Sequence, residues 1–274
     1  VVLGVVTGAP PGVAPEVGVG SRFLLAPTAP AGTPAAPAAV AAGAAALLAA
    51  REAVSVVRGG WRACLVPLSP PQRLLVFGSV DVAAAAAHLG ELLGFRVTVC
   101  DARAALTTPA RFPGVRDLVV ERPDRYLARE RDAGRLGRAP VLLVLTHDPR
   151  FDLPLLRTAL RLPDVGYLGA MGSRRTHADR AARLAAAGLA GAAAGRVRGP
   201  LGLDLRGATP AETALSVLAE VVAVLRGGTG LPLSATTGPI HAPRAAGDTP
   251  GGAPARGSGD APACTGDAAW RGVV

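Results

Sequence analysis

The amino-acid sequence predicts an α/β protein whose main domain is a doubly wound parallel sheet with helices on both faces. Short apolar runs alternate with longer helical patterns over roughly 150 residues, and this alternation favours parallel strands joined by helical crossovers. The first apolar run, Leu74–Phe77, is stopped by Gly78, as expected of a strand buried on both faces. The main domain is therefore expected to be Rossmann-like.

Each element of this domain follows from a local pattern. Five strands are expected at residues 74–77, 96–100, 117–120, 141–145 and 166–168. Helices are expected at residues 82–93, 126–135, 153–162, 173–187 and 210–225. The last helix has the clearest start, because Thr209 precedes Pro210 and is followed by Glu212 at the third helical position. Gly94 and Gly188 stand where glycines commonly end helices.

Composition divides the chain into three parts. Residues 1–70 are rich in Ala, Gly, Pro and Val, and are expected to form a small, degenerate α+β region. Within it, residues 1–6 and 53–57 are expected to be strands, and residues 38–53 an Ala-rich helix. The run Ser69-Pro70-Pro71 predicts a stiff linker into the main domain at 71–230. Residues 231–274 are expected to be a largely disordered tail.

Charge and cysteine usage exclude several classes of protein. The formal net charge is +9, but the arginines are spread along the chain and no nucleic-acid-binding motif occurs, so a solvated basic surface is expected. No window is long and apolar enough for a membrane span. The three cysteines are far apart and form no CxxC pair, which argues against a zinc site or disulfide framework and favours the cytoplasm.

The turn after the first strand partly matches a dinucleotide-binding fingerprint. Gly78 occupies the position of its first glycine, and Asp101 follows 23 residues later, near the spacing of a ribose-binding acid. Ser79, Val80 and Asp81 complete the turn, however, and a valine at the second glycine position keeps a pyrophosphate away from the backbone. The alternatives are an NAD(P) site or a tight turn with Asp81 as helix cap.

A second group of polar residues follows the most apolar strand. Thr146, His147 and Asp148 come directly after it, and the carboxyl ends of parallel strands are where such sheets bind ligands. A histidine beside an acid is suited to acid–base chemistry or ligand binding. The alternative is that Asp148 only caps the next helix before Pro149.

The segment after the fifth strand has the features of an anion site. Gly169 and Gly172 allow a ligand to approach the backbone. Ser173 is placed to cap the following helix, and Arg174 and Arg175 add forked donors at its positive end. We expect this segment to bind a phosphate or carboxylate. The alternative is that the two arginines only form a solvated first turn of the helix.

Taken together, these motifs resemble the C-terminal domain of the XdhC/CoxI family. The matching stretches are RLLVFGSVDVAAA, RVTVCDAR, VLLVLTHDPRFD, YLGAMGSRRTHADR and GPLGLDLRGATPAETALSVLAE, in family order. The resemblance covers about residues 66–241. It implies a maturation and insertion chaperone that delivers the molybdenum cofactor, a molybdopterin-type ligand, to the apo-enzyme subunit of a xanthine dehydrogenase or CO dehydrogenase type molybdoenzyme.

The chain departs from the family pattern in two places. The usual Gly-Ala-Gly-His opening reads Gly78-Ser79-Val80-Asp81, and the Ser-Gly-Gly-Cys-Val-Glu motif of the N-terminal domain is missing from residues 1–70. A phosphorylated ligand fits the predicted anion site, and a homodimer fits the apolar helix faces. The sequence assigns no catalytic residue or metal ligand, and leaves open a second function, an NAD(P)-dependent oxidoreductase.

Overall fold

The computed structural model describes residues 2–9, 19–25, 54–58, 60–68, 70–146, 148–189, 191–238 and 240. They fall into two compact units, a first that includes residues 1–68 and a second that spans residues 69–242. The Ala-rich helix expected over residues 38–53 lies outside the described residues, and so does the tail expected over 231–274 from residue 241 onward. The described part of that tail contains a short 3-10 helix at Leu233–Ala235.

The first unit contains a four-stranded antiparallel sheet. Its strands are β1 (Val2–Gly8), β2 (Arg22–Leu25), β3 (Val54–Arg58) and β4 (Trp61–Pro67), in the order β2-β1-β4-β3. Val6, Phe23 and Leu65 are buried in it. The strands expected at residues 1–6 and 53–57 correspond to β1 and β3. The strands β2 and β4 were not predicted, because Gly, Pro and Arg in and beside them interrupt the alternation of apolar and polar residues.

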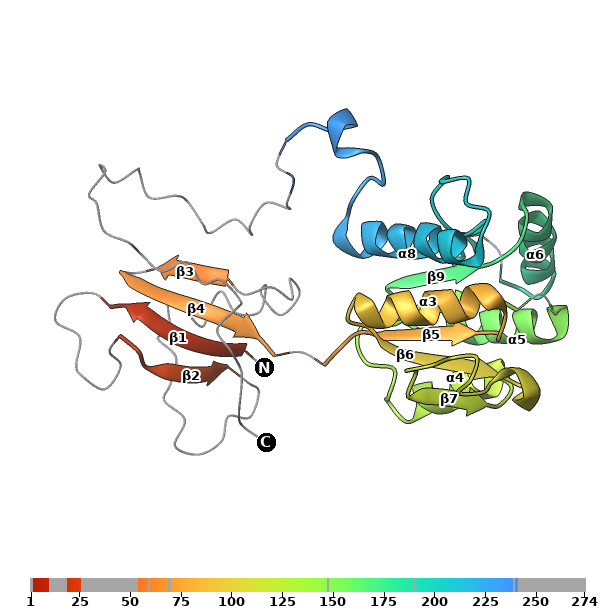
Figure 1. Ribbon diagram of the computed structural model, residues 1–274, viewed down its shortest axis with the longest axis horizontal. Coiled ribbons are helices and arrows are strands. Elements are labelled where there is room, and N and C mark those ends of the chain that lie inside the picture. Colours follow the sequence, from red (N-terminus) through yellow and green to blue (C-terminus); the bar gives the residue numbers. More distant parts are fainter. Residues whose placement is uncertain are drawn as a thin grey trace. The chain divides into compact units, whose positions relative to one another are not determined.

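The second unit contains a five-stranded parallel sheet in the order β7-β6-β5-β8-β9 (Figure 1). Its strands are β5 (Arg73–Phe77), β6 (Arg96–Asp101), β7 (Asp117–Val120), β8 (Val141–Val144) and β9 (Tyr167–Ala170). The chain starts in the middle at β5, builds outward to β7, and returns to place β8 on the other side of β5. The strand order therefore reverses between β5 and β8, which is where such sheets open a crevice.

Helices cover both faces of this sheet. On one face α3 (Asp81–Leu92) and α8 (Pro210–Arg226) pack over Leu74, Val76 and Leu143. On the other, α4 (Pro123–Asp132), α5 (Pro149–Leu160) and α6 (Arg174–Ala186) pack with Leu75 and Leu142. Short helices α7 (Ala192–Gly195), η2 (Ala104–Leu106) and η3 (Leu233–Ala235) lie in the connections. This is the predicted Rossmann-like α/β fold.

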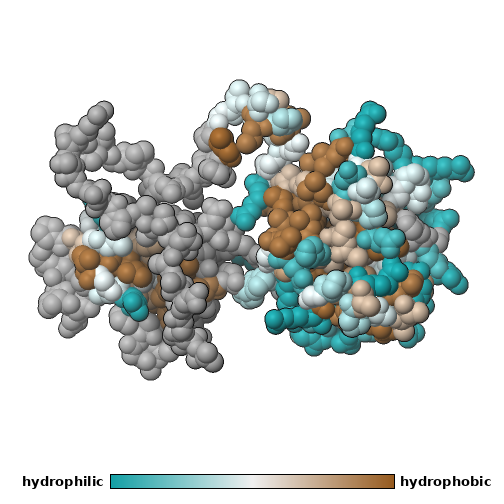
Figure 2. Space-filling view, viewed as in Figure 1, coloured by the Kyte–Doolittle hydropathy of each residue, from teal (hydrophilic) through white to brown (hydrophobic). Residues whose placement is uncertain are grey.

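Small residues allow α3 and α8 to lie close together over the sheet (Figure 1). The buried side of α3 consists of Ala83, Ala86, Ala87 and Gly90, and a Cβ on Gly90 would stand 2.4 Å from the Leu74 side chain. In Figure 2 hydrophobic residues gather over these two helices, where Leu92, Leu215 and Val222 are exposed. No described helix is long and apolar enough to cross a membrane.

Several predicted boundaries shift by a few residues. Prolines stand at the first helical position of α4 and α5, so both helices begin earlier than predicted, at Pro123 and Pro149. The predicted cap of α3 is wrong, since Val80 occupies that position and Asp81 lies inside the first turn. The strand β9 extends to Ala170 and includes Gly169, which was expected in a loop, because Gly169 pairs with Leu143. The predicted capping box of Thr209 and Glu212 is confirmed.

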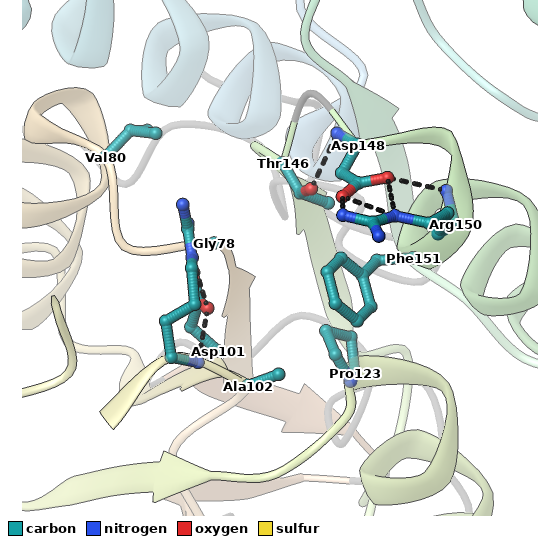
Figure 3. Close-up of a pocket in the computed structure, with 10 residues that line it drawn as sticks. Gly78, Val80, Asp101, Ala102, Pro123, Thr146, Asp148, Arg150 and Phe151 are labelled. Atoms are coloured by element: carbon teal, nitrogen blue, oxygen red, sulfur yellow. Dashed lines mark hydrogen bonds and ion pairs between the residues drawn. The ribbon is translucent and has the colours of Figure 1, made fainter. Parts of the chain in front are cut away.

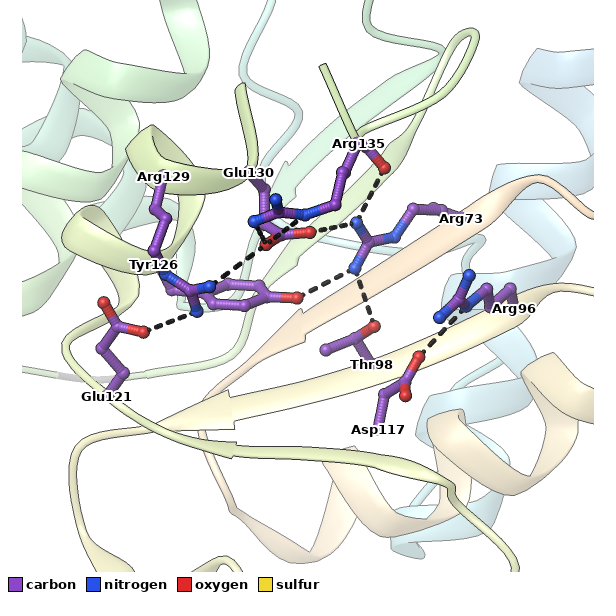
Figure 4. Close-up of polar contacts among 9 residues, drawn as sticks. All are labelled: Arg73, Arg96, Thr98, Asp117, Glu121, Tyr126, Arg129, Glu130 and Arg135. Atoms are coloured by element: carbon purple, nitrogen blue, oxygen red, sulfur yellow. Dashed lines mark hydrogen bonds and ion pairs between the residues drawn. The ribbon is translucent and has the colours of Figure 1, made fainter. Parts of the chain in front are cut away.

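A buried ion-pair cluster lies at the amino end of the sheet (Figure 4). Arg73, the first residue of β5, donates to Glu130 Oε2 at 2.7 Å and to the Tyr126 hydroxyl at 2.9 Å. It also donates to Thr98 Oγ1 on β6 and to the Arg135 carbonyl. The cluster ties β5 and β6 to α4, since Tyr126 and Glu130 are one turn apart on that helix.

Candidate functional site

A crevice of about 600 Å³ opens at the carboxyl ends of β5, β6 and β8 (Figure 3). It is called the switch-point crevice below, and ten residues line it: Gly78, Val80, Asp101, Ala102, Arg103, Pro123, Thr146, Asp148, Arg150 and Phe151. Four of these, Gly78, Asp101, Thr146 and Asp148, are predicted site residues. The topology brings them together because β5 and β8 are neighbours, so that Phe77 pairs with Val144 although 66 residues lie between them in sequence.

Gly78 is required at its position by the backbone of the neighbouring strand. Its φ is +110°, in the region that favours glycine. A Cβ there would stand 2.8 Å from the Thr146 nitrogen and 3.0 Å from the Leu145 carbonyl carbon. The glycine therefore allows β5 to turn away beside the end of β8, which by itself accounts for its presence without a bound phosphate.

Asp101 is buried at the end of β6, and its carboxylate is already engaged. Oδ2 accepts from the Ser79 amide at 2.8 Å and from Arg103 Nη2 at 2.7 Å. Oδ1 accepts from the Arg103 amide and from its Nε, both at 2.9 Å. Burial acts to raise the pKa of Asp101, but the hydrogen bonds from Arg103 and Ser79 outweigh it, and the pKa lies below its ordinary value.

Ser79 and Asp81 do not line the crevice. Ser79 is buried, and its hydroxyl lies 3.0 Å from Thr107 Oγ1, so it supports the turn from behind. Asp81 is exposed and accepts from Arg111 Nη2 at 2.8 Å. Val80 does line the crevice, with its side chain where a fingerprint glycine would leave room for a pyrophosphate.

Asp148 caps the start of α5 and stands on the opposite wall of the crevice from Asp101 (Figure 3). Its amide donates to Thr146 Oγ1 at 3.1 Å, and its Oδ1 accepts from the Arg150 amide at 2.9 Å, so the predicted helix cap is confirmed. Its carboxylate also pairs with the Arg150 guanidinium at 2.6 Å. These bonds from Arg150 lower the pKa of Asp148 to about 2. His147 lies outside the described residues.

The residues from Gly169 to Arg175 lie outside the crevice lining. Gly169 is within β9, where a Cβ would meet Leu201 at 2.2 Å. Ser173 caps α6 by accepting from the Thr176 amide at 3.1 Å, as predicted. Arg174 and Arg175 are exposed, and their side chains make no hydrogen bond or ion pair with other described residues.

Gly172 stands at the turn into α6. Its φ is +146°, and a Cβ would stand 2.9 Å from the Thr176 side chain. Arg180 on α6, which is buried, donates to the Met171 carbonyl at 2.8 Å and to Asp152 at 3.2 Å. The segment is thus held to α5 and is not brought into the lining with Gly78, Asp101 and Asp148.

Six lining residues were not among the predicted site residues. They are Val80, Ala102, Arg103, Pro123, Arg150 and Phe151. Five of the six could have been found from their position in the sequence, because all but Pro123 lie within three residues of Gly78, Asp101 or Asp148. The sequence could not show that the start of α4 reaches the same crevice, because that depends on how α4 packs on the sheet.

The sequence of the second unit matches a known domain family. Residues 74–221, more than half of the chain, match the family model described as the XdhC Rossmann domain. The chain belongs to the XdhC family. It is 39% identical over 83 residues to the molybdenum cofactor insertion chaperone PaoD of Escherichia coli K12, a match that covers 30% of this chain and 26% of PaoD. This chain thus aligns with about a quarter of that relative.

Among solved structures, this XdhC-family chain is similar to a crystal structure of a xanthine dehydrogenase from Bacillus halodurans. The TM-score is 0.51 and the identity 24%, over 61% of this chain and 46% of that chain. At this identity the likeness shows a shared fold and nothing finer.

The cysteine of this XdhC domain is unsuited to sulfur transfer. Cys100 is buried on β6, and its thiol lies 3.5 Å from the Glu121 carbonyl, to which it donates. Burial, together with the charges of Glu121 and Asp101, raises the pKa of this thiol far above its ordinary value. Because the thiolate is the nucleophile, Cys100 is expected to be inert.

Proposed function

We propose that this XdhC-family protein binds the molybdenum cofactor in the switch-point crevice and passes it to the apo-enzyme subunit of a xanthine dehydrogenase or CO dehydrogenase type molybdoenzyme. The support is the family match together with the similarity to PaoD, which is named an insertion chaperone. The transfer is proposed to take place in the cytoplasm. The cofactor is the cargo in this proposal, and the redox chemistry of its metal belongs to the receiving enzyme.

The crevice fits a cargo of this kind. Its volume of about 600 Å³ lies within the range of sites that enclose a small organic ligand, about 300–1,000 Å³. Phe151 and Pro123 give it an apolar wall on which a flat ring can lie (Figure 3). Arg103 and Arg150 supply guanidinium groups of the type that binds phosphate in a forked geometry.

Both arginines form ion pairs with aspartates, but their own side chains are accessible to water. The Arg103 side chain is 52% exposed and that of Arg150 is 84% exposed. Exposed ion pairs contribute little net free energy. A phosphate can therefore replace Asp148 as the partner of Arg150 at small cost. Arg103 stays paired with Asp101, whose side chain is only 6% exposed, and offers a phosphate the donors that this pair leaves free.

The segment Gly172–Arg175 is a second proposed contact for a phosphate. Two exposed arginines and the N-terminal turn of α6 favour an anion there. A cargo with both a pterin and a nucleotide has more than one anionic group, so the crevice and this segment are not exclusive. Homodimer formation remains a proposal without a contact to support it.

The geometry argues against NAD(P) in the usual pose. A ribose-binding acid needs free acceptor positions, whereas the carboxylate of Asp101 accepts four hydrogen bonds from Ser79 and Arg103. The Val80 side chain also lines the place where the pyrophosphate approaches the turn. An oxidoreductase activity is therefore the less supported function.

Binding of the released cofactor under anaerobic conditions tests the proposal. The measurement is equilibrium dialysis, with bound pterin quantified by fluorescence after oxidation. We expect an Arg103→Ala/Arg150→Ala double variant to bind about tenfold or more weakly, as expected when phosphate loses charge-assisted hydrogen bonds. An Arg174→Ala/Arg175→Ala variant measures the second contact separately, and Arg131→Ala, which removes an exposed pair with Asp132 on α4, is the control.

Two outcomes would contradict the proposal at different levels. Equal binding by wild type and the Arg103→Ala/Arg150→Ala variant would remove the crevice as the site. No binding by the wild type, together with no reconstitution of an apo-xanthine dehydrogenase by the loaded protein, would remove the function itself.

A further inference from the structure

The carboxylates of Asp101 and Asp148 face the same crevice but differ in what they can still bind. Asp101 is buried, and its four hydrogen bonds hold Ser79 and Arg103 in place. The side chain of Asp148 is 30% exposed, and its one bond to the backbone is the cap on the Arg150 amide. Since a carboxylate offers about four acceptor positions, Asp148 retains several once the Arg150 side chain moves away.

The partner of Asp148 is able to move. The Arg150 side chain is 84% exposed and makes no bond to another residue among those described. It begins two residues after Asp148 on the same helical turn, so it can turn outward into water or onto a phosphate without disturbing α5. Its departure leaves an ionised carboxylate in the crevice that keeps the bond from the Arg150 amide and can accept further bonds from a ligand in place of water.

A flat ring beside Asp148 would lie against Phe151. That side chain stands between Arg150 and Pro123 in the wall of the crevice (Figure 3). The Arg122 guanidinium lies 5.7 Å from the centre of the Phe151 ring and helps to hold it in one position. A ligand stacked on a fixed aromatic ring, with its edge toward a carboxylate, must present hydrogen-bond donors along that edge.

Pterins and guanine share such an edge. Their 2-amino-4-oxopyrimidine ring carries a ring N–H next to an exocyclic amino group, two parallel donors that match the two oxygens of a carboxylate. Hypoxanthine lacks the amino group, and lumazine has a carbonyl oxygen in its place. A carboxylate therefore discriminates within each pair, since one bidentate contact to a base edge is worth about tenfold or more in affinity.

We propose that Asp148 is the specificity residue of the crevice and recognises the 2-amino-4-oxopyrimidine ring of the cargo, with the ring stacked on Phe151. This inference rests on the proposed function and names the chemistry that the crevice selects. Arg150, released from Asp148, is then free to contact the phosphate of the same ligand.

Matched ligand pairs test the inference on the full-length chain. Affinities are measured by isothermal titration for pterin against lumazine and for guanosine monophosphate against inosine monophosphate. We expect the wild type to prefer the amino-bearing member about tenfold in at least one pair. Preference in the pterin pair alone identifies the ring as the pterin, and preference in the guanosine pair identifies it as the base of a dinucleotide form.

The matched variant is Asp148→Asn. Asparagine caps helices as well as aspartate does, so the start of α5 and the shape of the crevice are expected to persist. The amide places an N–H₂ group against one donor of the ligand, so the preference for guanosine monophosphate should fall to about onefold while inosine monophosphate binds as before. The preference for pterin should disappear or reverse, because the new N–H₂ group can donate to the carbonyl oxygen of lumazine. Asp132→Asn, an exposed acid paired with Arg131 on α4, should retain the wild-type preference.

Equal affinities within both pairs for the wild type would overturn the inference, as would a preference that Asp148→Asn retains. If the cofactor still binds in either case, the proposed function stands and only the role of Asp148 fails. A wild type that binds neither the cofactor nor any of the four probes contradicts both proposals.

Discussion

The two ends of the parallel sheet each carry arginine–carboxylate pairs, and the two sets are built differently (Figures 3 and 4). At the amino end, the side chains of Arg73 and Glu130 are 9% and 7% exposed. Each has further partners, Tyr126 and Thr98 for Arg73 and Arg135 for Glu130. At the carboxyl end, the Arg150 side chain is 84% exposed, and its partner Asp148 lines an open crevice.

The difference shows which charges support the fold and which are available to a ligand. A buried charge with several hydrogen bonds cannot leave them without a large desolvation cost. An exposed guanidinium exchanges one anion for another at little cost. The amino end is therefore a structural clamp between β5, β6 and α4, and the carboxyl end is a place where an incoming anion can take over a guanidinium.

The largest effect is expected from Glu130→Ala at the amino end. The substitution leaves the Arg73 guanidinium buried without its counter-ion, and breaking such a pair costs about 3–5 kcal/mol of stability. Urea unfolding followed by circular dichroism measures the loss. The control is Asp132→Ala on the same helix, whose exposed pair with Arg131 should leave the midpoint unchanged. A midpoint equally unchanged in Glu130→Ala would mean that the cluster is not a clamp.

A smaller effect is expected from Gly78→Ala at the carboxyl end. The residue would be held at a φ of +110° with its Cβ 2.8 Å from the Thr146 nitrogen, and strain of this kind costs about 1–3 kcal/mol. Because relief of the contact moves the end of β8, cofactor binding should also weaken. The matched control is Gly134→Ala, which has a φ of +65° but open space around it. Equal losses from the two substitutions would show that the contact with β8 is unimportant.

The smallest effect is expected in the pH dependence of stability, where the carboxylates at the two ends of the sheet should behave differently in acid. Burial acts to raise the pKa of Glu130, but hydrogen bonds from Arg135 and Arg73 outweigh it, so the folded pKa lies below 4.5. A lowered folded pKa contributes stability that is present above the unfolded pKa and is lost as pH falls through the folded one. Unfolding midpoints of the wild type should therefore decline as pH falls below about 4.5, and Glu130→Gln should flatten this decline.

Asp148→Asn is the matched control for these measurements of the unfolding midpoint as a function of pH. The Asp148 side chain is 30% exposed, and hydrogen bonds from Arg150 lower its pKa to about 2, so its contribution would be lost only between pH 3.8 and about 2. Its unfolding midpoints should follow those of the wild type down to pH 4. A flattened decline in Asp148→Asn but not in Glu130→Gln would reverse the assignment of roles.

Most of the parallel sheet could be predicted from the sequence. Strands such as Leu74–Phe77 and Val141–Val144 are short, wholly apolar runs, which is the composition favoured in a strand buried on both faces. Helix starts were predicted where a side chain caps the backbone locally, as at Thr209 and Ser173. Prediction failed at β2 and β4 of the first unit, because Gly, Pro and Arg in and beside these strands interrupt the alternation of apolar and polar residues.

The candidate site was predicted in part. The rule that ligands bind beyond the carboxyl ends of strands selected Gly78, Asp101, Thr146 and Asp148, and all four line the crevice. The same rule selected the segment up to Arg175, which lies outside the lining. Phe151 and Pro123 were not selected, because a residue type gives no sign that it will face a ligand and not the core.

By itself, the sequence determined the fold class, the places where chain turns meet strand ends, and the caps that start the helices. These features depend on apolar periodicity and on contacts between residues a few positions apart, so a short stretch of sequence is enough to predict them. Only the tertiary structure decided that the carboxylate of Asp101 is buried and hydrogen-bonded to Arg103 and Ser79, whereas that of Asp148 pairs with an arginine exposed to water. Whether a carboxylate is available depends on its burial and its neighbours in space, and neither quantity exists until β5, β6, β8 and α5 are packed together.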